Sequence, residues 1–489
     1  MTPAEREFFA ALADVVFGNP FSPERDRLIV RLAPGAKPPK PGDPTIDREA
    51  LARVVAPKLA PFMRDGALAL QVLNTEDRRL LEPAILYVGY HRCVPQLDAL
   101  IERQVSRDSD PPLVPDGDEL IADLVRCGIA PETAPRNFAL YYQLRRAFHF
   151  IHRSLAGDCE SMRRFREALW NNVFTHDMRG FHSALWNRME DFSTLLLGET
   201  GTGKGQAAAA IGRSAFIPYL PEQRRFAANF TETFMAINLS QFSEHLIESE
   251  LFGHRKGAFS GAIDHHQGVF ERCDPHGALF LDEIGEVSIP AQIKLLQVLQ
   301  ERTYTPVGGR EKKRFSGRVI AATNQPLGEL RRQGKFRDDF FYRLCSDVIE
   351  LPTLRQRIAE SPKELEQLIE LLVARIAGRE APELVASVLE SLQKGLPRGY
   401  AWPGNVRELE QAVRRILLTG RYAADLPRAG EAGPSLETMM AEGRLSADEM
   451  LARYCAMLYR RLGSYAAVAE RTGLDPRTSR KYILAAKSG

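Results

Sequence analysis

Apolar residues recur every three or four positions along three stretches of the first 155 residues, at 3–17, 48–62 and 135–155. This spacing places them on one face of a helix and predicts amphipathic helices. Two Pro-rich segments, 33–44 and 106–118, are predicted loops. The apolar run 84–90 fits either a strand or a buried helix. The pattern therefore predicts a mostly helical N-terminal domain over residues 1–155, with its longest apolar stripe formed by Phe138, Tyr141, Tyr142, Leu144, Phe148 and Ile151.

The pattern changes after residue 155. Short apolar runs bounded by glycine or polar residues alternate with helical stretches as far as residue 358, which favours a parallel sheet covered by helices. Residues 359–424 have a helical pattern, residues 425–444 form a predicted linker rich in Gly, Ala and Pro, and residues 445–489 are again helical. The predicted strands are 193–197, 234–237, 278–281 and 318–322.

Composition adds few constraints. A chain of 489 residues is too long for a single core, and its 44% hydrophobic and 26% charged residues are ordinary for a soluble globular protein. The six cysteines have no CxxC or zinc spacing, so reduced thiols are expected, and His91 and Cys93 lack the partners that a metal site requires. The sequence shows no signal peptide and no apolar stretch of membrane-spanning length, which predicts a cytoplasmic protein.

The sequence GETGTGKG follows the predicted strand 193–197 and opens a helical stretch. Glycines at this place let backbone N–H groups surround phosphate oxygens, a lysine reaches the terminal phosphates, and the helix N-terminus favours an anion. A plain glycine-rich turn is the alternative, which the order of strand, loop, lysine and helix disfavours. The predicted phosphate-binding loop consists of Gly198, Glu199, Thr200, Gly201, Thr202, Gly203, Lys204 and Gly205.

Two further predicted strands end in polar residues. Asp282 and Glu283 follow strand 278–281, where one carboxylate can coordinate Mg²⁺ and its neighbour can activate a water molecule. Asn324 follows strand 318–322, where an amide can sense the terminal phosphate. A solvated turn is the alternative for the acidic pair, and the phosphate-binding loop upstream makes it the weaker reading.

Residues 257–262 have the sequence GAFSGA, which has no evident use in folding or in phosphate chemistry. Small residues around Phe259 and Ser260 suit a loop tip that exposes an aromatic ring and a hydroxyl. Arg337, Arg343 and Arg407 are further candidates, because a guanidinium stabilises a transferring phosphoryl group and can come from a neighbouring subunit. For each arginine alone, a surface ion pair is the alternative.

These motifs occur in the order found in the AAA+ ATPases. More narrowly, residues 156–420 resemble the bacterial enhancer-binding proteins, the sigma-54-dependent transcriptional activators, through ESELFGH, GAFSGA, GALFLDEIGE, RVIAATN and WPGNVRELE. The resemblance implies an α/β AAA+ P-loop core over 156–358 with a helical lid over 359–424. It also implies a ring, usually a hexamer, that binds ATP and Mg²⁺ between its subunits.

The resemblance assigns a role to each motif by position. Residues 198–205 would bind the phosphates, Asp282 would hold Mg²⁺, and Glu283 would activate water under the restraint of Asn238. Asn324 would be the first sensor, Arg407 the second sensor, and Arg337 and Arg343 fingers acting on the neighbouring subunit. The residues expected to contact sigma-54 are Gly257, Ala258, Phe259, Ser260, Gly261 and Ala262.

The sequence departs from the family pattern at five places, two of which are the segments 177–190 and 213–231, longer than usual. Ser260 stands where the family usually has threonine, which keeps the hydroxyl and loses a methyl group. Gly205 stands where the family usually has glutamate, and the general loop pattern has a Mg²⁺-contacting Ser or Thr. After LPTLRQR the chain continues IAESPKELEQL in place of an acidic pair and proline. None of these changes removes a predicted catalytic residue.

Residues 451–489 contain eight Lys or Arg and two acidic residues. The pattern predicts a helix, a turn at 472–475 and a second helix from Pro476, with a small core of Ala466, Val468 or Ala469, Leu474 and Ile483. This segment resembles the Fis-type helix-turn-helix, and the helix 445–462 would make a dimer contact. A basic solvated hairpin is the alternative. The side chains predicted to face DNA are Arg477, Thr478, Ser479, Arg480 and Lys481.

The sequence therefore predicts a sigma-54-dependent activator that binds double-stranded DNA upstream of promoters and uses ATP to open complexes of sigma-54 RNA polymerase. It is expected to form homo-oligomers from dimer to hexameric ring, with no membrane partner. A ring ATPase acting on another target and a repressor without turnover are the alternatives, which GAFSGA and the complete catalytic set oppose. Residues 1–155 lack the acidic pocket, central Asp and Lys of a phospho-receiver, and are predicted to respond to a ligand or a protein.

Overall fold

The computed structural model describes residues 1–36, 48–64, 67–68, 73–106, 112–397, 399–422 and 446–485. Residues 1–421 and 422–489 form two compact units. The predicted linker at 425–444, and parts of the predicted loops at 33–44 and 106–118, lie outside the described residues.

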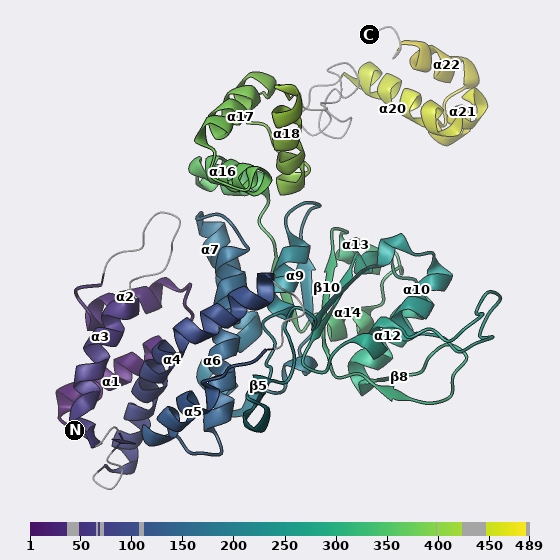
Figure 1. Cartoon of the computed structure of the whole chain (residues 1–489). Coiled ribbons are helices and arrows are strands. Elements are labelled where there is room, and N and C mark those ends of the chain that lie inside the picture. The colour runs from purple at the N-terminus through teal and green to yellow at the C-terminus, as the bar shows by residue number, and fades with distance from the viewer. Residues whose placement is uncertain are drawn as a thin grey trace. The chain divides into compact units, whose positions relative to one another are not determined.

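The N-terminal part of the first unit is helical, as predicted (Figure 1). The apolar run 84–90 lies within the 32-residue helix α4, so the buried-helix alternative is the right one. Four residues of the predicted stripe, Phe138, Tyr141, Tyr142 and Ile151, are buried. The elements are α1 (Pro3–Val16), α2 (Pro23–Leu32), α3 (Arg48–Leu59), η1 (Ala60–Phe62), β1 (Met63–Arg64), β2 (Ala67–Leu68), α4 (Thr75–Ser106), α5 (Gly117–Arg126), α6 (Ala134–Phe148) and the π-turn η3 (His149–Arg153).

A sheet of five parallel strands forms the centre of the unit. All four predicted strands are present. The fifth, at one edge, has a single buried side chain, Ile349, and therefore no apolar run that would reveal it in the sequence. In spatial order the strands are β11 (Asp347–Glu350), β3 (Thr194–Leu197), β10 (Arg318–Thr323), β7 (Ala278–Asp282) and β6 (Phe234–Asn238).

Side chains alternate between the two faces of this sheet, as the period of two in a strand requires. Leu196, Phe280 and Ile320 belong to one buried cluster, and their neighbours Leu195 and Leu279 belong to another. The second cluster is completed by helices that follow β6, β7 and β10. These elements are η7 (Leu239–Gln241), α10 (Glu244–Phe252), α11 (Val269–Arg272), η8 (Ile284–Glu286), α12 (Ile289–Glu301), the β8 (Thr303–Tyr304) and β9 (Lys313–Arg314) hairpin, α13 (Leu327–Arg332) and α14 (Asp338–Leu344).

The first cluster joins the N-terminal helices to the sheet, so no separate core ends at residue 155. Helix α6 is fixed to the end of α9 through Arg146, which donates to the carbonyl oxygens of Arg213 and Ala215, each at 2.7 Å. Val114 N donates to the Arg224 carbonyl oxygen, and Phe226 N donates to the Pro112 carbonyl oxygen. The connecting elements are α7 (Glu160–Phe174), α8 (Met178–Gly180), η4 (Phe181–Leu185), η5 (Met189–Asp191), α9 (Lys204–Gly212), β4 (Tyr219–Leu220), η6 (Pro221–Gln223) and β5 (Arg225–Phe226).

Four helices follow the sheet: α15 (Leu354–Glu360), α16 (Lys363–Ala377), α17 (Pro382–Gly395) and α18 (Asn405–Thr419). A buried ion pair links the first two, with Arg357 Nε 2.8 Å from Glu364 Oε1. Arg357 also donates to the Ala156 carbonyl oxygen, and Asp158 N donates to Glu364. Gly157 has φ +118°, and an added Cβ would lie 1.9 Å from the Glu364 carboxylate. This pair therefore holds the lid against the segment that enters α7.

Replacing Arg357 with methionine is expected to destabilise the first unit by about 3–5 kcal/mol, because Glu364 would remain buried without its cation. The double replacement Arg357→Met/Glu364→Leu should recover part of this loss. The control is Lys394→Met, which breaks the exposed Lys394–Glu390 pair of α17 and should cost less than about 1 kcal/mol. Thermal unfolding monitored by circular dichroism measures all three. Equal effects of Arg357→Met and Lys394→Met would contradict the expectation.

The second unit consists of α20 (Ala447–Leu462), α21 (Tyr465–Thr472) and α22 (Pro476–Ala485). Val468 and Ile483 are buried as predicted, but Ala466 is exposed and its predicted core role is wrong. Cys455 and Leu458 take that place, because α20 packs against both shorter helices. Gly473, with φ +73°, lets the chain turn sharply between α21 and α22.

All six cysteines are free, in agreement with the spacing argument. Within the described ranges, none of the helices combines the length and the apolar character that crossing a bilayer requires.

Candidate functional site

The glycine-rich loop connects β3 to α9, as predicted. Gly201 (φ +80°) and Gly203 (φ +103°) adopt left-handed backbone conformations that glycine tolerates without strain. Lys204 Nζ donates to the carbonyl oxygens of Gly198 at 2.9 Å and Glu199 at 3.3 Å. Burial lowers the pKa of Lys204, while the carboxylates of Glu283 and Asp282 act in the opposite direction. The loop thus holds its own lysine beside two carboxylates.

A pocket of about 310 Å³ lies over this loop, within the size range of small-molecule sites. It is lined by residues 200–206 of the loop, by both carboxylates of the acidic pair, and by Arg407 of α18. Residues 154–156 and the lid helix α16 complete the wall. The fold therefore brings together Thr200, Gly201, Thr202, Gly203, Lys204, Gly205, Asp282, Glu283 and Arg407 from the predicted set.

The acidic pair and Asn324 meet at the carboxyl ends of neighbouring strands. Asp282 ends β7, and Glu283 follows with φ +56°, an uncommon conformation for a residue other than glycine. Asn324 Nδ2 donates to Thr200 Oγ1 at 2.8 Å, and its backbone N lies 3.4 Å from Glu283 Oε2. Asn324 thus bridges the phosphate loop and the second carboxylate.

Asn238 ends β6 and pairs in register with Asp282. Its side-chain oxygen accepts hydrogen bonds from Ser240, at 3.0 Å from the backbone N and 2.7 Å from Oγ. In this conformation the Asn238 side chain caps η7, while Glu283 accepts from Asn324. The restraint of Glu283 by Asn238 therefore stays a prediction.

The first two loop residues do not line the pocket. Glu199 forms a bidentate ion pair with Arg355 of α15 at 2.8 and 2.5 Å, and hydrogen bonds from Arg355 and then Asn405 lower its pKa. Asn405 is buried, donates to Glu199 and to the Thr200 carbonyl oxygen, and accepts from Leu354 N. Asn405 was missed as a site residue, although its place in WPGN ahead of Arg407 was the available signal. The loop is therefore tied directly to the lid.

Close approach explains why glycine stands at position 201. An added Cβ would lie 2.1 Å from the Gly404 carbonyl oxygen, and Val406 N donates to the Gly201 carbonyl oxygen at 3.1 Å. Any larger residue at position 201 would separate the phosphate loop from the start of α18, which carries Arg407.

The two other arginines lie outside this pocket's lining. Arg337 precedes α14 and pairs with Asp339 at 2.7 Å. Arg343, on the same helix, donates to the Leu299 carbonyl oxygen at 2.7 and 3.0 Å. Neither guanidinium reaches the nucleotide pocket of its own chain, so any contact with a nucleotide would require a second copy.

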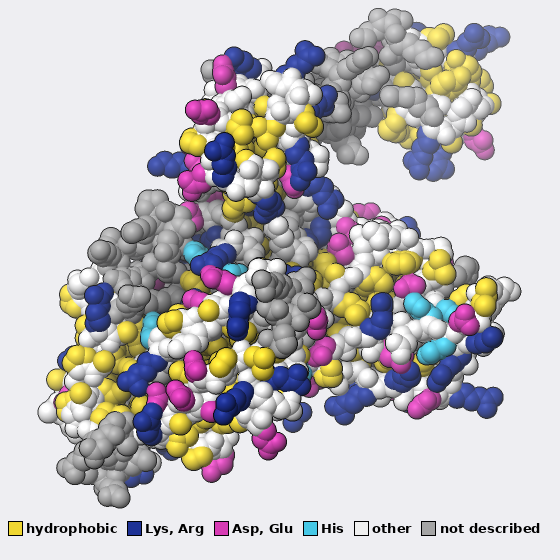
Figure 2. Space-filling view, in the orientation of Figure 1, with side chains coloured by type: hydrophobic (Ala, Val, Ile, Leu, Met, Phe, Trp, Pro, Cys, Tyr) yellow, Lys and Arg dark blue, Asp and Glu magenta, His cyan; other side chains and the backbone are white. Residues whose placement is uncertain are grey.

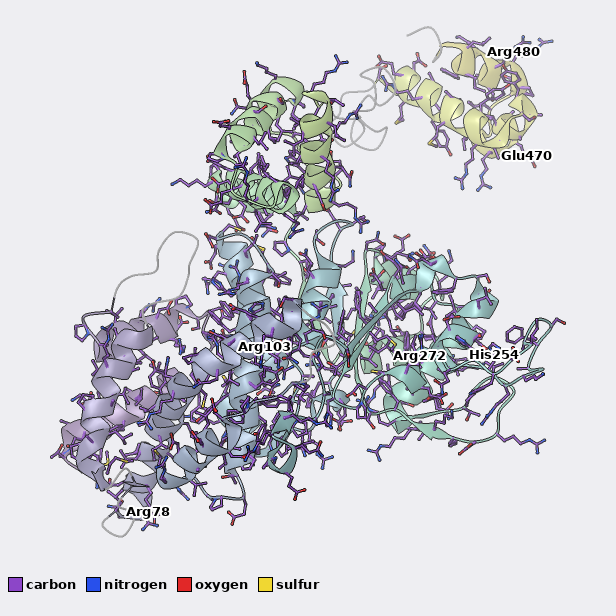
Figure 3. The ribbon with its side chains drawn as sticks, in the orientation of Figure 1. Arg78, Arg103, His254, Arg272, Glu470 and Arg480 are labelled. Atoms are coloured by element: carbon purple, nitrogen blue, oxygen red, sulfur yellow. The ribbon has the colours of Figure 1, made fainter. Side chains whose placement is uncertain are left out.

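The GAFSGA segment forms a projecting loop between α10 and α11 (Figure 3, near His254). Gly257 N donates to the Ala262 carbonyl oxygen at 2.8 Å, and Ala262 N donates to the Phe259 carbonyl oxygen at 3.0 Å, so the loop closes on itself. The Phe259 ring packs edge-on against His254, with centroids 4.9 Å apart, and keeps 38% of its surface exposed. Figure 2 shows histidine and apolar side chains together at this edge of the molecule.

A second loop supports the first. Arg255 N donates to the Val307 carbonyl oxygen at 3.0 Å, and an added Cβ on Gly308 would lie 2.8 Å from Ala258. The elements that carry the two loops, α10 and the β8–β9 hairpin, pack in the same buried cluster. The loop that exposes the Phe259 ring is therefore supported by the second loop.

On the C-terminal unit, Arg477, Arg480 and Lys481 are exposed, and Figure 3 shows Arg480 on the outer side of α22. Thr478 is half-buried, and its hydroxyl donates to Asp475. Ser479 is fully buried, so the prediction that it faces outward is wrong. The reason is geometric: five consecutive residues span more than a full helical turn, and Ser479 shares the inner face with Ile483.

Comparison with known proteins identifies the central region. Residues 178–350 match the family described as the Sigma-54 interaction domain. The DNA-binding transcriptional regulator NtrC of Azospirillum brasilense is 42% identical over 226 residues, which are 46% of this chain and 43% of that protein. The Nif-specific regulatory protein of Azotobacter vinelandii is 38% identical over 294 residues, 58% of this chain and 52% of that protein.

A third relative is the Sigma54-dependent transcriptional regulator SfnR of Pseudomonas fluorescens (strain Pf0-1). It is 41% identical over 230 residues, 47% of this chain and 57% of that protein. The chain thus spans about half the length of the curated relatives it matches. The crystal structure of NtrX from Brucella abortus in complex with ATP has a TM-score of 0.41 and 21% identity over 80% of this chain and 86% of that chain, a similarity too low for comparing the two sites residue by residue.

Proposed function

We propose that this chain, whose residues 178–350 match the Sigma-54 interaction domain, is a sigma-54-dependent activator that remodels sigma-54 RNA polymerase. ATP hydrolysis would convert the closed promoter complex into the open one. The observation that carries the proposal is a pocket that brings the phosphate loop, the acidic pair and Arg407 together on the same sheet as a supported loop with an exposed phenyl ring. A function on sigma-54 RNA polymerase would place the protein in the cytoplasm.

The pocket residues supply the chemistry of hydrolysis. Backbone N–H groups of the loop and Lys204 bind the phosphates, and Arg407 reaches the same pocket from the lid. Glu283 accepts a proton from the attacking water, oriented by the hydrogen bond from Asn324. Asp282 is a suitable Mg²⁺ ligand, because hard cations prefer carboxylate oxygens, and the metal would neutralise charge on the phosphates. Since Gly205 offers no hydroxyl, phosphate and water oxygens would complete that ligand set.

The pocket also requires a second copy of the chain. Arg337 and Arg343 lie outside their own pocket, and a guanidinium supplied by a neighbouring subunit stabilises phosphoryl transfer. A closed ring, with a hexamer as the expected form, would place these arginines at the adjacent nucleotide. In that arrangement the ion pair with Asp339 would have to exchange for contact with phosphate.

The proposal is tested by mixing the full chain with Mg-ATP, sigma-54 holoenzyme and a sigma-54 promoter, and by mapping unpaired thymines with permanganate. The expected result is melting that requires ATP and does not occur with a holoenzyme carrying another sigma factor. ATP turnover without melting would instead support the alternative of a ring ATPase with a different target, and would overturn the proposal.

We further propose that the C-terminal unit is a Fis-type helix-turn-helix that binds duplex DNA. Helix α22 would enter the major groove with Arg477, Arg480 and Lys481, which are exposed and carry no acidic neighbour on that helix. Thr478 remains a candidate at the helix start. Helix α20 still exposes Tyr454, Met457 and Leu462 after it packs on α21 and α22, which supports a dimer contact along this helix.

Replacing Arg480 with alanine is expected to weaken binding to a duplex selected from random DNA by about 1–3 kcal/mol, or to reduce the salt slope by about one if the contact is to phosphate. Two controls share the unit: Arg461→Ala changes an exposed arginine of α20, and Ser479→Ala changes a buried residue. Both should bind DNA like the original chain. Ser479 Oγ has no hydrogen-bond partner among the described residues, so Ser479→Ala should also raise the melting temperature. A loss of affinity in Ser479→Ala equal to that of Arg480→Ala would contradict this assignment.

A further inference from the structure

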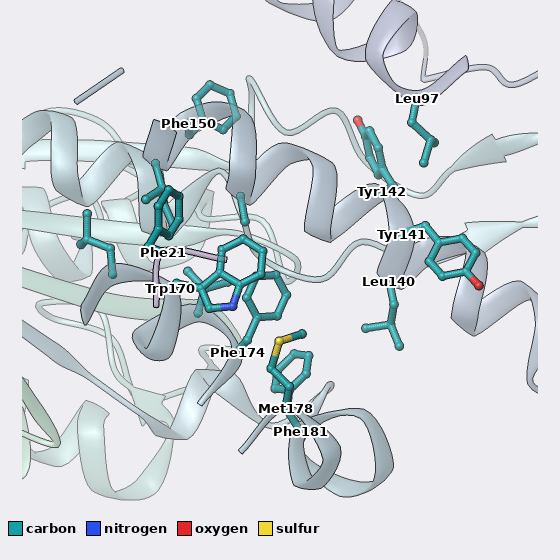
Figure 4. Close-up of a cluster of buried hydrophobic side chains, with 14 of the residues drawn as sticks. Phe21, Leu97, Leu140, Tyr141, Tyr142, Phe150, Trp170, Phe174, Met178 and Phe181 are labelled. Carbon is teal, nitrogen blue, oxygen red and sulfur yellow. The ribbon is translucent and has the colours of Figure 1, made fainter. Parts of the chain in front are cut away.

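A second cavity lies in the N-terminal part, between the turn that follows α1 and helices α2, α4, α6 and α7. Its volume of about 100 Å³ exceeds several-fold the ~10–15 Å³ that a single water molecule needs. Most of the wall is aromatic or aliphatic. In Figure 4, Trp170, Phe174, Met178 and Phe181 follow one another along α7, α8 and η4, with Leu140 of α6 nearby. The phosphate pocket uses none of these residues.

Two buried N–H donors at this cavity have no acceptor. Arg25 Nε donates to the Val15 carbonyl oxygen at 2.8 Å, but its Nη1 has no partner among the described residues. Trp170 Nε1 is buried and also has no partner within the described part of the chain. By contrast, the hydroxyl of Tyr141 donates to the Leu86 carbonyl oxygen at 2.8 Å. These two donors are thus one cationic and one neutral group.

Leaving such donors buried without partners is unfavourable, and most so for a cation. Burial lowers the pKa of Arg25, but a guanidinium stays protonated in proteins. A carboxylate is a small anionic group that accepts from a guanidinium in a planar geometry. A phosphate, with more oxygens and more charge, would need more donors than these mostly apolar walls provide. The remaining volume favours a flat apolar body, which can pack against the ring of Trp170 or Phe174.

We propose that this cavity binds a small aromatic carboxylic acid, with Arg25 Nη1 and Trp170 Nε1 donating to its carboxylate. The aromatic body would lie against the α7 and η4 side chains. His182 is not a competing charge, because burial lowers its pKa to about 4 and its Nε2 lies 2.7 Å from Asn137 Oδ1.

Two helices of the cavity wall also contact the ATPase sheet and the phosphate-loop helix. Helix α6 contributes Leu140 and Tyr141 to the cavity, and its residues Gln143 and Arg146 donate to carbonyl oxygens at 213–215, directly after α9. Helix α7 contributes Trp170, and its Asn172 donates to Thr194 of β3 at 3.0 Å. Because α9 begins at Lys204, occupancy of the cavity can alter the phosphate loop through packed helices. This regulatory role rests on the proposed ATPase function, whereas binding does not.

The binding test uses the full chain without nucleotide and two probes, benzoate and phenylacetate, with benzamide as the uncharged counterpart of benzoate. We expect at least one acid to bind with a Kd of about 1 mM or lower and benzamide at least about tenfold more weakly. Titration calorimetry gives the affinities, and thermal unfolding gives an independent shift. No binding by either acid, or equal binding of benzoate and benzamide, would overturn the proposal.

Variants separate the site from general effects on the fold. Arg25→Met should weaken acid binding at least about tenfold, and Trp170→Phe, which keeps an aromatic ring, should weaken it less. Arg31→Met is the matched control, because Arg31 is exposed on the same helix, α2. Unchanged binding in both Arg25→Met and Trp170→Phe would refute the assignment even if one variant folded poorly.

ATP turnover tests the regulatory part. Saturating acid should change the rate at least about twofold, and Arg31→Met should keep this response. Binding with an unchanged rate would refute the coupling alone. A chain that binds the acid but never hydrolyses ATP would refute the proposed function and leave the binding site standing.

Discussion

Replacing Glu283 with glutamine is expected to lower ATP turnover at least about 100-fold while ATP still binds. The amide keeps the size of the side chain and can still accept from Asn324 N, but it cannot take a proton from water. Lys204 and Arg407, which line the phosphate pocket, are unchanged by this substitution. Phosphate release measures turnover, and a fluorescent ATP analogue measures binding.

Glu350→Gln is the matched control. Glu350 is exposed and ends β11, so it also lies where the carboxyl ends of the parallel strands meet. Its turnover should stay within about twofold of the original chain. If Glu283→Gln keeps more than about a tenth of the activity, Glu283 is not the general base.

Phe259→Ala is expected to reduce open-complex formation at least about 30-fold while ATP turnover persists. Removing an aromatic side chain at the centre of a contact commonly costs about 2 kcal/mol or more. The loop's backbone hydrogen bonds and its contact with the second loop do not involve the ring, so the loop should keep its shape. Permanganate reactivity of the promoter and phosphate release are measured in the same reaction.

Ile263→Ala provides the comparison for this loop. Ile263 is 75% exposed, four residues beyond Phe259, and it lies outside the GAFSGA segment. It should open promoters within about threefold of the original chain. Equal defects in the two variants would show that any exposed apolar side chain of this loop contributes to promoter opening. Phe259 would then make no specific contact with the sigma factor.

The site was predictable where a motif coincides with a strand end. Lys204, Asp282, Glu283 and Asn324 are recognisable because glycine, charge and amide follow apolar runs, and parallel strands bring their carboxyl ends to one edge. Asn405 was missed, since its hydrogen bonds to the phosphate loop depend on how the lid folds back. Glu199 belongs to the loop in sequence, yet its carboxylate is directed to Arg355 by the same long-range packing.

Two other features of the fold were not predicted from the sequence. They are the side chains of α22 that face inward and the helix faces that share a core with the sheet. Ser479 was predicted to face outward because it lies within the basic run at 477–481. A helical projection of α22 places it on the inner face, where it is buried. In the N-terminal half, spacing predicted the helices, but it does not show which of their faces meet the sheet. The unsatisfied Arg25 and Trp170 donors likewise result from packing among four helices distant in sequence.

The shared core between α6 and the segment that follows α9 constrains how this chain can diversify. If another domain replaced residues 1–155, Tyr219, Phe226 and Phe230 would lose the aromatic rings of Phe138 and Tyr142 that pack against them. Each large side chain exposed in this way would forfeit about 1.5–3 kcal/mol. A successful exchange must therefore preserve the inner surface of α6. The N-terminal helices and the segment at 213–230 are expected to acquire compensating substitutions together in descendants of this chain.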